Sequence, residues 1–529
     1  MTEPSTRREF LRHAAGGGVI ATAALAASLA LDGCASEESK GAEQTTTTSL
    51  GPPQSRDWAA LAASLTGSLV LPSSGSYDSD RLLYNSKFTD LHPQGIAYCD
   101  GPDDVARCVD FATGHEIATS ARSGGHSYAG YSSCDGLVID VSRLSSITVD
   151  TSANTATIGA GALLIDVYNE VGARGRLLPG GSCPTVGIAG LTLGGGIGVF
   201  ARKYGLTLDL RSLDVVTADT MLRRASDHHH ADLYWACRGG GGGNFGIATS
   251  FTFDVHPMPE LTLFTLQYPW AAATTMLEAW QRWLATTPDE LWSNCQLLSQ
   301  GTYGFLGQVG GVYCGSPAAL ASYLAPLQSA IDTAPTYSFN ASNAYLDAME
   351  IESGCSGLSV AACHLSSENP HGELSRSSYS AKSSYVDTAL SSRRCASMVE
   401  AVEHLADLAP TLGGGLAFDA YGGAINRMAR DATAFVHRDK LACIQATYSW
   451  SAYTSASVIN DGRAWLDWLG KHVFNAQTGA YQNYIDPTLE DWRSAYYGSN
   501  LDRLVKIKRR YDPENHFSFA QSIPLHLPS

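Results

Sequence analysis

The sequence predicts an α+β fold built from two parts, and three observations support this prediction. Between residues 57 and 260, short runs rich in β-branched residues alternate with stretches of helical periodicity. Two glycine-rich segments of this part, 122–130 and 179–187, each hold one nucleophilic side chain among small residues. Between residues 261 and 475, longer strand-like runs alternate with helices, which predicts a second α+β part.

The composition sets limits on the class of protein. With 529 residues, of which 44% are hydrophobic, the chain is long and apolar enough for two or three domains with a sizeable core. The net charge of −16 argues against nucleic acid as a partner, because nucleic-acid binding calls for basic patches. The 12 cysteines would be free thiols in the cytosol, whereas outside it Cys355 and Cys363 are candidates for a pair.

The N-terminus predicts export. The segment Thr6–Arg12 contains a twin-arginine pattern, and a weakly apolar run follows that is too short and soft for a membrane anchor. Residues 1–35 are therefore expected to be a Tat signal peptide and residues 36–56 a flexible linker. Cys34 ends a lipobox-like sequence, so we expect either lipidation there or simple cleavage nearby. The mature protein is expected to be extracellular or a cell-surface lipoprotein.

The elements of the first part are predicted from their periodicity and their ends. A helix over 102–112 has Pro102 at its first position and two aspartates in its first turn. A second helix is predicted over 162–171. The predicted strands cover residues 95–99, 117–121, 136–141, 147–150, 155–159, 213–218 and 247–255.

In the second part, apolar runs predict strands and helical periodicity predicts helices. The predicted strands cover 261–268, 308–313 and 442–448, and the predicted helices cover 271–286 and 317–331. Residues 476–529 form a further segment dense in aromatic and charged residues.

The first glycine-rich segment, Arg122–Gly130, directly follows a predicted strand. Successive backbone N–H groups in such a turn can form a nest for a pyrophosphate. An isolated Gly-Gly-His-Ser would more often be a plain turn with a structural histidine. Here the pattern extends from Arg122 into the strand over 137–140, which favours a cofactor loop with His126 as its nucleophile.

Cys183 lies in the segment Gly-Gly-Ser-Cys-Pro-Thr-Val-Gly, and a second glycine cluster follows at 190–198. A lone cysteine is more often a buried free thiol. Its place in a loop that leads into a glycine cluster favours contact with a ligand. An imidazole and a thiol against the same cofactor could each bond to it, which indicates a flavin tethered at two points.

Two other patterns are misleading. Residues 241–246 satisfy G-x-G-x-x-G, but a strand rather than a helix follows them, so a nicotinamide-binding Rossmann unit is rejected. The run Asp227–His230 suggests a metal site, yet consecutive histidines rarely converge on one ion, so a surface loop is expected and no metal is predicted.

Tyr481 and Tyr484 flank Asn483 near the C-terminus. Two phenols so close in sequence fit either core packing or catalysis. Because the ordinary pKa of tyrosine is about 10, a tyrosine base must be deprotonated by its neighbours or lose its proton in concert with hydride departure.

Together these segments resemble the berberine bridge enzyme-like FAD-linked oxidases, which have the vanillyl-alcohol oxidase fold with a PCMH-type FAD-binding domain. The resemblance covers about residues 80–525. It rests on five ordered segments, at 122–127, 183–187, 232–246, 481–484 and 511–523.

The resemblance implies the domain organisation. Residues 57–260 would form the FAD-binding domain, and residues 261–475 a substrate domain with an antiparallel sheet and helices. Residues 476–529 would return to the FAD-binding domain. Tyr421, Gln445 and Trp450 are candidates for lining the substrate pocket.

The resemblance also implies roles for single residues. His126 would bond to the flavin 8α carbon and Cys183 to carbon 6. Tyr484 would be the base, with Tyr481 as its partner or substitute. Val186 falls at a gatekeeper position where valine accompanies oxidases. The other residues assigned to the FAD site are Arg122, Ser123, Gly124, Gly125, Ser127, Gly187, Gly190, Gly194, Gly195, Gly196, Gly198, Asn244, Phe245, Gly246, Ile247 and Asn483.

One departure from the family concerns the second bond. Many members have Gly-Gly-His before the second glycine cluster, where this chain has Ala189-Gly190-Leu191. Bacterial proteins resembling 6-hydroxynicotine oxidases share the Gly-Leu-Thr-Leu-Gly-Gly-Gly sequence, and some carry only the histidyl bond. The presence of Cys183 still favours a second bond.

The implied function is an exported FAD-dependent oxidase. It would take hydride from a CH–OH group of a sugar, an oligosaccharide or a secondary metabolite and reduce molecular oxygen to hydrogen peroxide. Three alternatives remain: a flavin dehydrogenase with another acceptor, an oxidative cyclase, and a non-catalytic binding lipoprotein.

Overall fold

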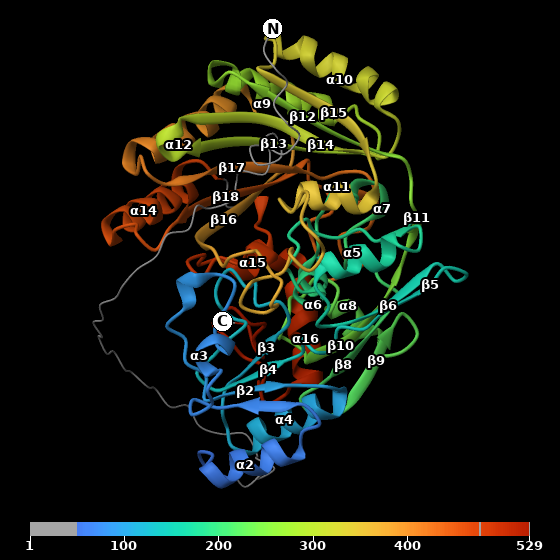
Figure 1. Ribbon diagram of the computed structural model, residues 1–529, viewed down its shortest axis with the longest axis vertical. Coiled ribbons are helices and arrows are strands. Elements are labelled where there is room, and N and C mark those ends of the chain that lie inside the picture. The colour runs from blue at the N-terminus through green and yellow to red at the C-terminus, as the bar shows by residue number, and fades with distance from the viewer. Residues whose placement is uncertain (1–49, 475–477, 528–529) are drawn as a thin grey trace.

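The computed structural model describes residues 50–474 and 478–527 (Figure 1). The predicted signal peptide, Cys34 and most of the predicted linker lie outside the described residues. Within the described ranges, no helix combines the length and the apolar character needed to cross a lipid bilayer.

The lower half in Figure 1 contains two sheets. In the first, of order β1-β2-β4-β3, three neighbouring strands run parallel and the edge strand β1 is antiparallel. Its strands are β1 (Ser68–Val70), β2 (Gly95–Tyr98), β3 (Thr119–Arg122) and β4 (Leu137–Asp140). The predicted helix over 102–112 is α4 (Pro102–Gly114), which begins at a proline as expected and buries Val105, Cys108 and Val109.

The second sheet is antiparallel, with the order β5-β6-β10-β8-β9. Its strands are β5 (Ile147–Asp150), β6 (Thr155–Gly159), β8 (Ser212–Val216), β9 (Leu222–Ser226) and β10 (Ile247–Asp254). The helices of this half include α5 (Leu164–Gly172) and α8 (Ala231–Ala236). A short pair, β7 (Arg176–Leu177) and β11 (His256–Pro257), completes it.

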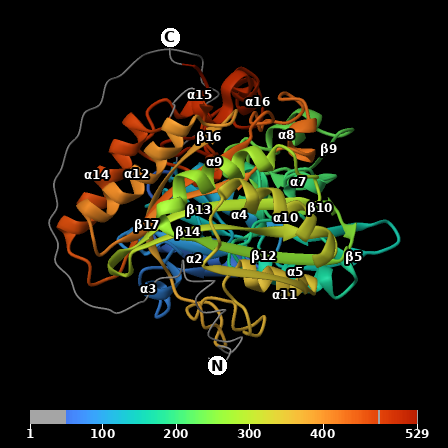
Figure 2. The same cartoon turned by 90° about the horizontal axis from the view of Figure 1, so that it is seen from above.

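The upper half is one antiparallel seven-stranded sheet of order β15-β12-β14-β13-β17-β18-β16. Its strands are β12 (Leu261–Tyr268), β13 (Leu291–Gln300), β14 (Phe305–Tyr313), β15 (Tyr337–Asn343), β16 (Ser378–Val386), β17 (Gly413–Ala420) and β18 (Ala442–Trp450). Four helices cover its outer face, α9 (Ala273–Leu284), α10 (Pro317–Ile331), α12 (Ser392–Leu408) and α14 (Ala456–His472), as Figures 1 and 2 show. The helix α11 (Tyr345–Glu352) packs against α5 of the other half.

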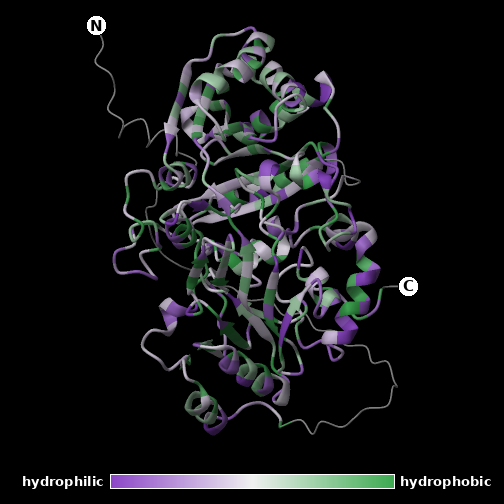
Figure 3. Cartoon of the chain, turned by 90° about the vertical axis from the view of Figure 1, so that its right-hand side faces the viewer, coloured by the Kyte–Doolittle hydropathy of each residue, from purple (hydrophilic) through white to green (hydrophobic). Residues whose placement is uncertain are grey.

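The C-terminal segment returns to the lower half. After η5 (Gln482–Tyr484), the helices α15 (Trp492–Tyr497) and α16 (Leu501–Tyr511) follow, and α16 packs on α8 (Figure 1). One face of α16 is buried and the opposite face carries charged residues, an amphipathic pattern that hydropathy colouring shows on several outer helices (Figure 3).

The predicted α+β class is confirmed. The second glycine cluster is not wholly a loop, because the helix α6 (Ile188–Gly194) covers its first part. Burial of Ile188, Ala189 and Leu193 against the core outweighs the low helix propensity of its glycines. Cys355 and Cys363 are both buried and remain free thiols.

Candidate active site

A cavity of about 500 Å³ lies where the two halves and the C-terminal segment meet. Its walls come from stretches of the chain that are far apart in sequence, so the fold itself assembles the site. Lining residues lie within 119–134, 181–197, 241–248, 481–485 and 517–521, and they also include Val141, Leu164, Gln445 and Tyr497.

The loop after β3 is built to face a ligand with its backbone. Gly125 has a φ of +66°, a conformation that favours glycine. Within the described residues, the backbone N–H groups of 123–127 make no hydrogen bond, although residues 123–127 line the cavity. Such a row of free donors is the nest expected for a pyrophosphate.

His126 is held in a fixed orientation. Its ring stacks on Tyr84 with a centroid distance of 3.8 Å, and its Nε2 lies 2.9 Å from Oγ1 of Thr185. Burial lowers the pKa of His126 to about 3, so the imidazole is neutral at pH 7 and one ring nitrogen keeps its lone pair.

Cys183 lines the same cavity. Burial raises the pKa of its thiol to about 11, while hydrogen bonds from Thr185 and from the backbone of Val186 lower it. The two predicted anchors therefore face one space and share Thr185 as a neighbour.

Two tyrosine rings and one amide also line the cavity. Tyr128 stacks on Tyr484 with a centroid distance of 5.4 Å, and Tyr379 meets the edge of Tyr128 at 4.9 Å. The Nε2 of Gln445 donates to the hydroxyl of Tyr128 at 2.8 Å. Of the three proposed pocket residues only Gln445 lines the cavity, since Tyr421 is buried in the core and Trp450 packs on Tyr448.

Tyr481 and Tyr484 have different surroundings. The hydroxyl oxygen of Tyr481 accepts hydrogen bonds from the N–H of Gly196 at 2.7 Å, of Ile197 at 3.3 Å and of the Asn483 amide at 3.0 Å. These donors oppose the burial that raises its pKa to about 12. The hydroxyl of Tyr484 has no such partner among the described residues, and burial raises its pKa well above the usual value.

Asp419 is a residue that sequence reasoning missed. It lies on β17, and burial raises the pKa of its carboxyl to about 7. Its charge contributes to the raised pKa of Tyr484. The signal in the sequence is an acidic residue inside an otherwise apolar strand, two positions before Tyr421-Gly-Gly.

Several residues assigned to the FAD site lie behind the cavity wall instead. The guanidinium of Arg122 pairs with Asp140 and donates to the carbonyl of Asp80 at 2.8 Å, so only its other atoms border the cavity. Phe245 is buried in the core. Neither it nor any of Gly194, Gly195, Gly196 and Gly198 is among the lining residues.

Those glycines give room to the C-terminal segment. A Cβ at Gly194 would overlap the Asn483 side chain, and one at Gly195 would lie 2.8 Å from the ring of Tyr481. Gly194 and Gly195 therefore permit close packing of the tyrosine segment, whereas Gly196 lies against Thr207 and Gly198 against Gly180.

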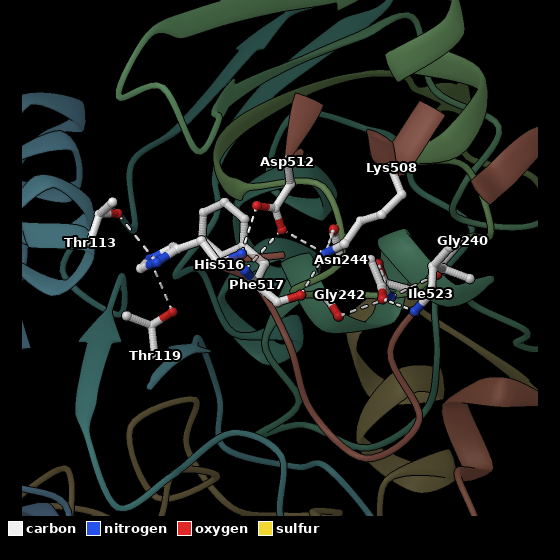
Figure 4. A network of polar contacts seen from close by, with 11 residues as sticks. Thr113, Thr119, Gly240, Gly242, Asn244, Lys508, Asp512, His516, Phe517 and Ile523 are labelled. Atoms are coloured by element: carbon white, nitrogen blue, oxygen red, sulfur yellow. Dashed lines mark hydrogen bonds and ion pairs between the residues drawn. The ribbon is translucent and has the colours of Figure 1, made fainter. Parts of the chain in front are cut away.

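A buried network joins the C-terminal segment to the glycine loop at 240–246 (Figure 4). Nζ of Lys508 donates to the carbonyl oxygens of Asn244 at 2.8 Å and Phe517 at 2.6 Å, and pairs with Asp512 at 2.6 Å. The side-chain oxygen of Asn244 accepts from the N–H of Ile523 at 2.8 Å. This network fixes one wall of the cavity.

The cavity residues fit FAD. A Cβ at Gly190 would meet no atom within 4 Å, so its helical backbone faces open space. Oγ of Ser133 is buried and unpartnered on the wall. The free N–H row of 123–127 suits the phosphates, and the volume is typical of a cofactor site.

Other predicted features have no part in this site. The run Asp227–His230 is exposed, as expected for a surface loop. In the described part of the chain, no cluster of three or more histidine, cysteine or acidic side chains could hold a metal ion. Residues 241–246 lead into β10, so no Rossmann unit is present there.

Comparison with known proteins supports the same conclusion. The model of an FAD binding domain matches residues 93–226, and the model described as berberine and berberine like matches residues 480–524. The chain is 32% identical over 466 residues to the uncharacterized FAD-linked oxidoreductase YgaK of Bacillus subtilis, covering 87% of this chain and 97% of that protein. It is 30% identical to the xylooligosaccharide oxidase of Thermothelomyces thermophilus, covering 84% and 88%.

A solved structure, BBE-like 1 of Physcomitrella patens, superimposes with a TM-score of 0.80 at 28% identity, covering 89% of this chain and 100% of that chain. Fold and site thus define an FAD-linked oxidoreductase. The chain belongs to the berberine bridge enzyme-like family of FAD-linked oxidoreductases.

Proposed function

We propose that this protein is an exported oxidase that oxidises a CH–OH group of a sugar or oligosaccharide, with FAD bonded to His126 and Cys183. When bound, FAD would supply a hydride acceptor that molecular oxygen can reoxidise, with hydrogen peroxide as the product. One observation carries the proposal: the two nucleophiles and the free hydroxyl of Tyr484 border one cavity.

Tyr484 is the better candidate for the base. The hydroxyl of Tyr481 is already engaged by three N–H donors, whereas that of Tyr484 is free to meet a substrate hydroxyl. Tyr481 holds the segment in place through those same bonds. A base must lie within hydrogen-bonding reach of the proton it removes, and Tyr484 borders the cavity in which we propose that the substrate binds.

Asp419 supports Tyr484 in this proposal. An ionised carboxylate nearby raises the pKa of the phenol, which makes the phenolate a stronger base. With its own pKa raised to about 7, Asp419 changes its charge near neutral pH and acts on Tyr484 through that charge.

The lining of the pocket supports a carbohydrate. Stacked tyrosine rings at positions 128 and 484 present apolar faces to sugar C–H groups, and Gln445 and the tyrosine hydroxyls provide hydrogen-bonding groups. Relatives of the chain include enzymes named xylooligosaccharide oxidase and glucooligosaccharide oxidase.

Oxygen as acceptor and export are further parts of the proposal. Val186 lines the cavity next to Cys183, which supports the gatekeeper role that accompanies oxidases. The twin-arginine segment supports export of a folded, cofactor-loaded protein, with Cys34 as a possible lipid anchor.

The test is a panel of mono- and oligosaccharides and non-sugar alcohols, with oxygen uptake and peroxide both measured. We expect at least one oligosaccharide to give one peroxide per oxygen consumed. Reduction of the flavin by a sugar without reoxidation in air would indicate a dehydrogenase. A purified protein without flavin absorbance would contradict the whole proposal.

A further inference from the structure

The side chain of Thr185 acts on both nucleophiles of the site. Its Oγ1 is 2.9 Å from Nε2 of His126, and its hydroxyl and its backbone N–H lower the pKa of the Cys183 thiol. Thr185 is 1% exposed and is not among the cavity-lining residues, whereas both of its partners are. It therefore contacts them from behind, on the side away from the cavity.

This contact determines which nitrogen of His126 is available. In the described part of the chain, Thr185 is the one hydrogen-bonding partner of the ring, and stacking on Tyr84 fixes the ring plane. Nδ1 has no partner, yet it is not among the fully buried unpartnered atoms, so it is open to the cavity. With Nε2 tied to Thr185, Nδ1 is the free nitrogen.

One hydroxyl can serve both partners at once. A threonine oxygen accepts one hydrogen bond while its own proton is donated elsewhere. Accepting the N–H at Nε2 selects the tautomer whose lone pair is at Nδ1. When the hydroxyl donates its proton to the sulfur, it favours the thiolate, which is the nucleophilic form. The backbone N–H groups of Thr185 and Val186 act in the same direction.

We propose that Thr185 is a positioning residue for both flavin attachments, accepting the Nε2 proton of His126 and donating to Cys183, so that Nδ1 and the sulfur are the bonding atoms. This inference rests on the proposed covalent attachment. At each anchor, one bond forms between the nucleophile and a flavin carbon. One hydrogen leaves that carbon and one leaves the nucleophile as protons. The two electrons that remain on the flavin pass to molecular oxygen, which gives hydrogen peroxide.

The test uses variants that keep only one anchor. Thr185→Val, which keeps the shape and removes the hydroxyl, and Thr185→Ser, which keeps the hydroxyl, are each combined with Cys183→Ala and with His126→Ala. Purified full-length proteins are denatured in acid, and bonded flavin is measured by gel fluorescence and intact mass. We expect Thr185→Val to lower the bonded fraction at least tenfold in both backgrounds, and Thr185→Ser to stay within twofold of its parent.

A matched control is Thr192→Val, which removes another buried hydroxyl, one without a partner. It should leave the bonded fraction unchanged. An unchanged bonded fraction in Thr185→Val, with flavin still bonded in the parent, would overturn the inference alone. Flavin released by acid from the wild-type protein would instead overturn the proposed covalent attachment.

A measurement on the wild-type protein does not depend on the folding of any variant. NMR of the isolated flavinyl peptide that contains His126 identifies the bonded nitrogen. Attachment at Nδ1 is expected, and attachment at Nε2 would contradict the role of Thr185.

Discussion

Nζ of Lys508 donates a 2.8 Å hydrogen bond to the carbonyl oxygen of Asn244, which lies 264 positions earlier in the chain. Both Lys508 and its ion-pair partner Asp512 have fully buried side chains. Removing one partner of a buried pair leaves an uncompensated charge, which costs about 3–5 kcal/mol. We expect Lys508→Met to lower the free energy of unfolding by that amount and to increase release of non-covalent flavin. Urea denaturation measures the first effect.

The control for this substitution is Lys506→Met on the exposed face of the same helix. It should change the free energy of unfolding by less than about 0.5 kcal/mol. Equal effects of the two substitutions would show that the buried network contributes nothing specific.

Substitution of the two tyrosines should separate catalysis from positioning. Tyr484→Phe removes the proposed base and should lower kcat by about 10²–10⁴ with little change in stability. Tyr481→Phe deprives three N–H donors of their acceptor, so it should lower the stability as well, by about 1–3 kcal/mol. Steady-state kinetics and thermal unfolding of both variants test this. A larger loss of kcat in a fully stable Tyr481→Phe protein would reverse the assignment.

The pH dependence of kcat should report on Asp419. Because its pKa is raised to about 7, the carboxyl is protonated below that pH and can accept a proton only above it. We expect kcat to rise through about pH 7 in the wild type, and Asp419→Asn to lose that step. A step that persists unchanged in Asp419→Asn belongs to another group.

Asp419 should also affect the pH dependence of stability, but in the opposite direction: the free energy of unfolding should fall as the pH rises. The folded-state pKa of Asp419 lies above its unfolded value of about 3.8, so the folded protein binds the proton more tightly. Its contribution to stability is full below about pH 4 and is lost as the pH rises through about 7. The pKa of Glu352 is also raised to about 7, so Glu352 should lower the free energy of unfolding over the same pH range. Urea titrations between pH 4 and 8 should show a shallower decline in Asp419→Asn.

Gly190 offers a test of where the cofactor lies. It is inside α6, where alanine is favoured over glycine by about 1 kcal/mol, and a Cβ there meets no protein atom. Gly190→Ala should therefore keep or raise the stability of the flavin-free protein while weakening non-covalent flavin binding, which is measured in the His126→Ala/Cys183→Ala background. The control is Gly470→Ala in α14, which should raise stability without affecting flavin binding. Unchanged flavin affinity in Gly190→Ala would place the cofactor elsewhere.

The two anchors should act independently. Flavin should stay bonded to the denatured protein in His126→Ala and in Cys183→Ala, and it should be absent in the double variant. Gel fluorescence after acid denaturation measures this. Loss of all bonded flavin in His126→Ala alone would show that only the histidine forms a bond. The sequence Ala189-Gly190-Leu191, which departs from the usual family sequence, is compatible with that outcome.

The sequence predicts local elements better than their long-range partners. The helix over 317–331 agrees with α10 at both ends, because its proline start and apolar periodicity are local signals. The sequence does not predict the helix α6, because its glycines disfavour a helix and tertiary burial stabilises it. The loops that carry His126 and Cys183 could be predicted because, as for α10, their signals lie within one short segment of sequence.

Long-range contacts account for what the sequence did not reveal. Asp419 has no motif around it, and its importance depends on burial near Tyr484. Thr185 is part of the segment around Cys183, yet its contact with His126 joins residues 59 positions apart. Gly194 and Gly195 were predicted to face the cofactor, whereas their neighbours are Asn483 and Tyr481, which lie much further along the chain.

The closure of the cavity by the last residues has a consequence for biosynthesis. The cavity walls include Tyr481, Asn483 and Phe519, and the N–H of Ile523 holds Asn244. These residues are synthesised long after the loops that carry His126 and Cys183, so a nascent chain cannot build the complete pocket before Ile523 has emerged, and cofactor loading must follow that point. A product that lacks residues 481–523 would not form the cavity in which flavin is taken up.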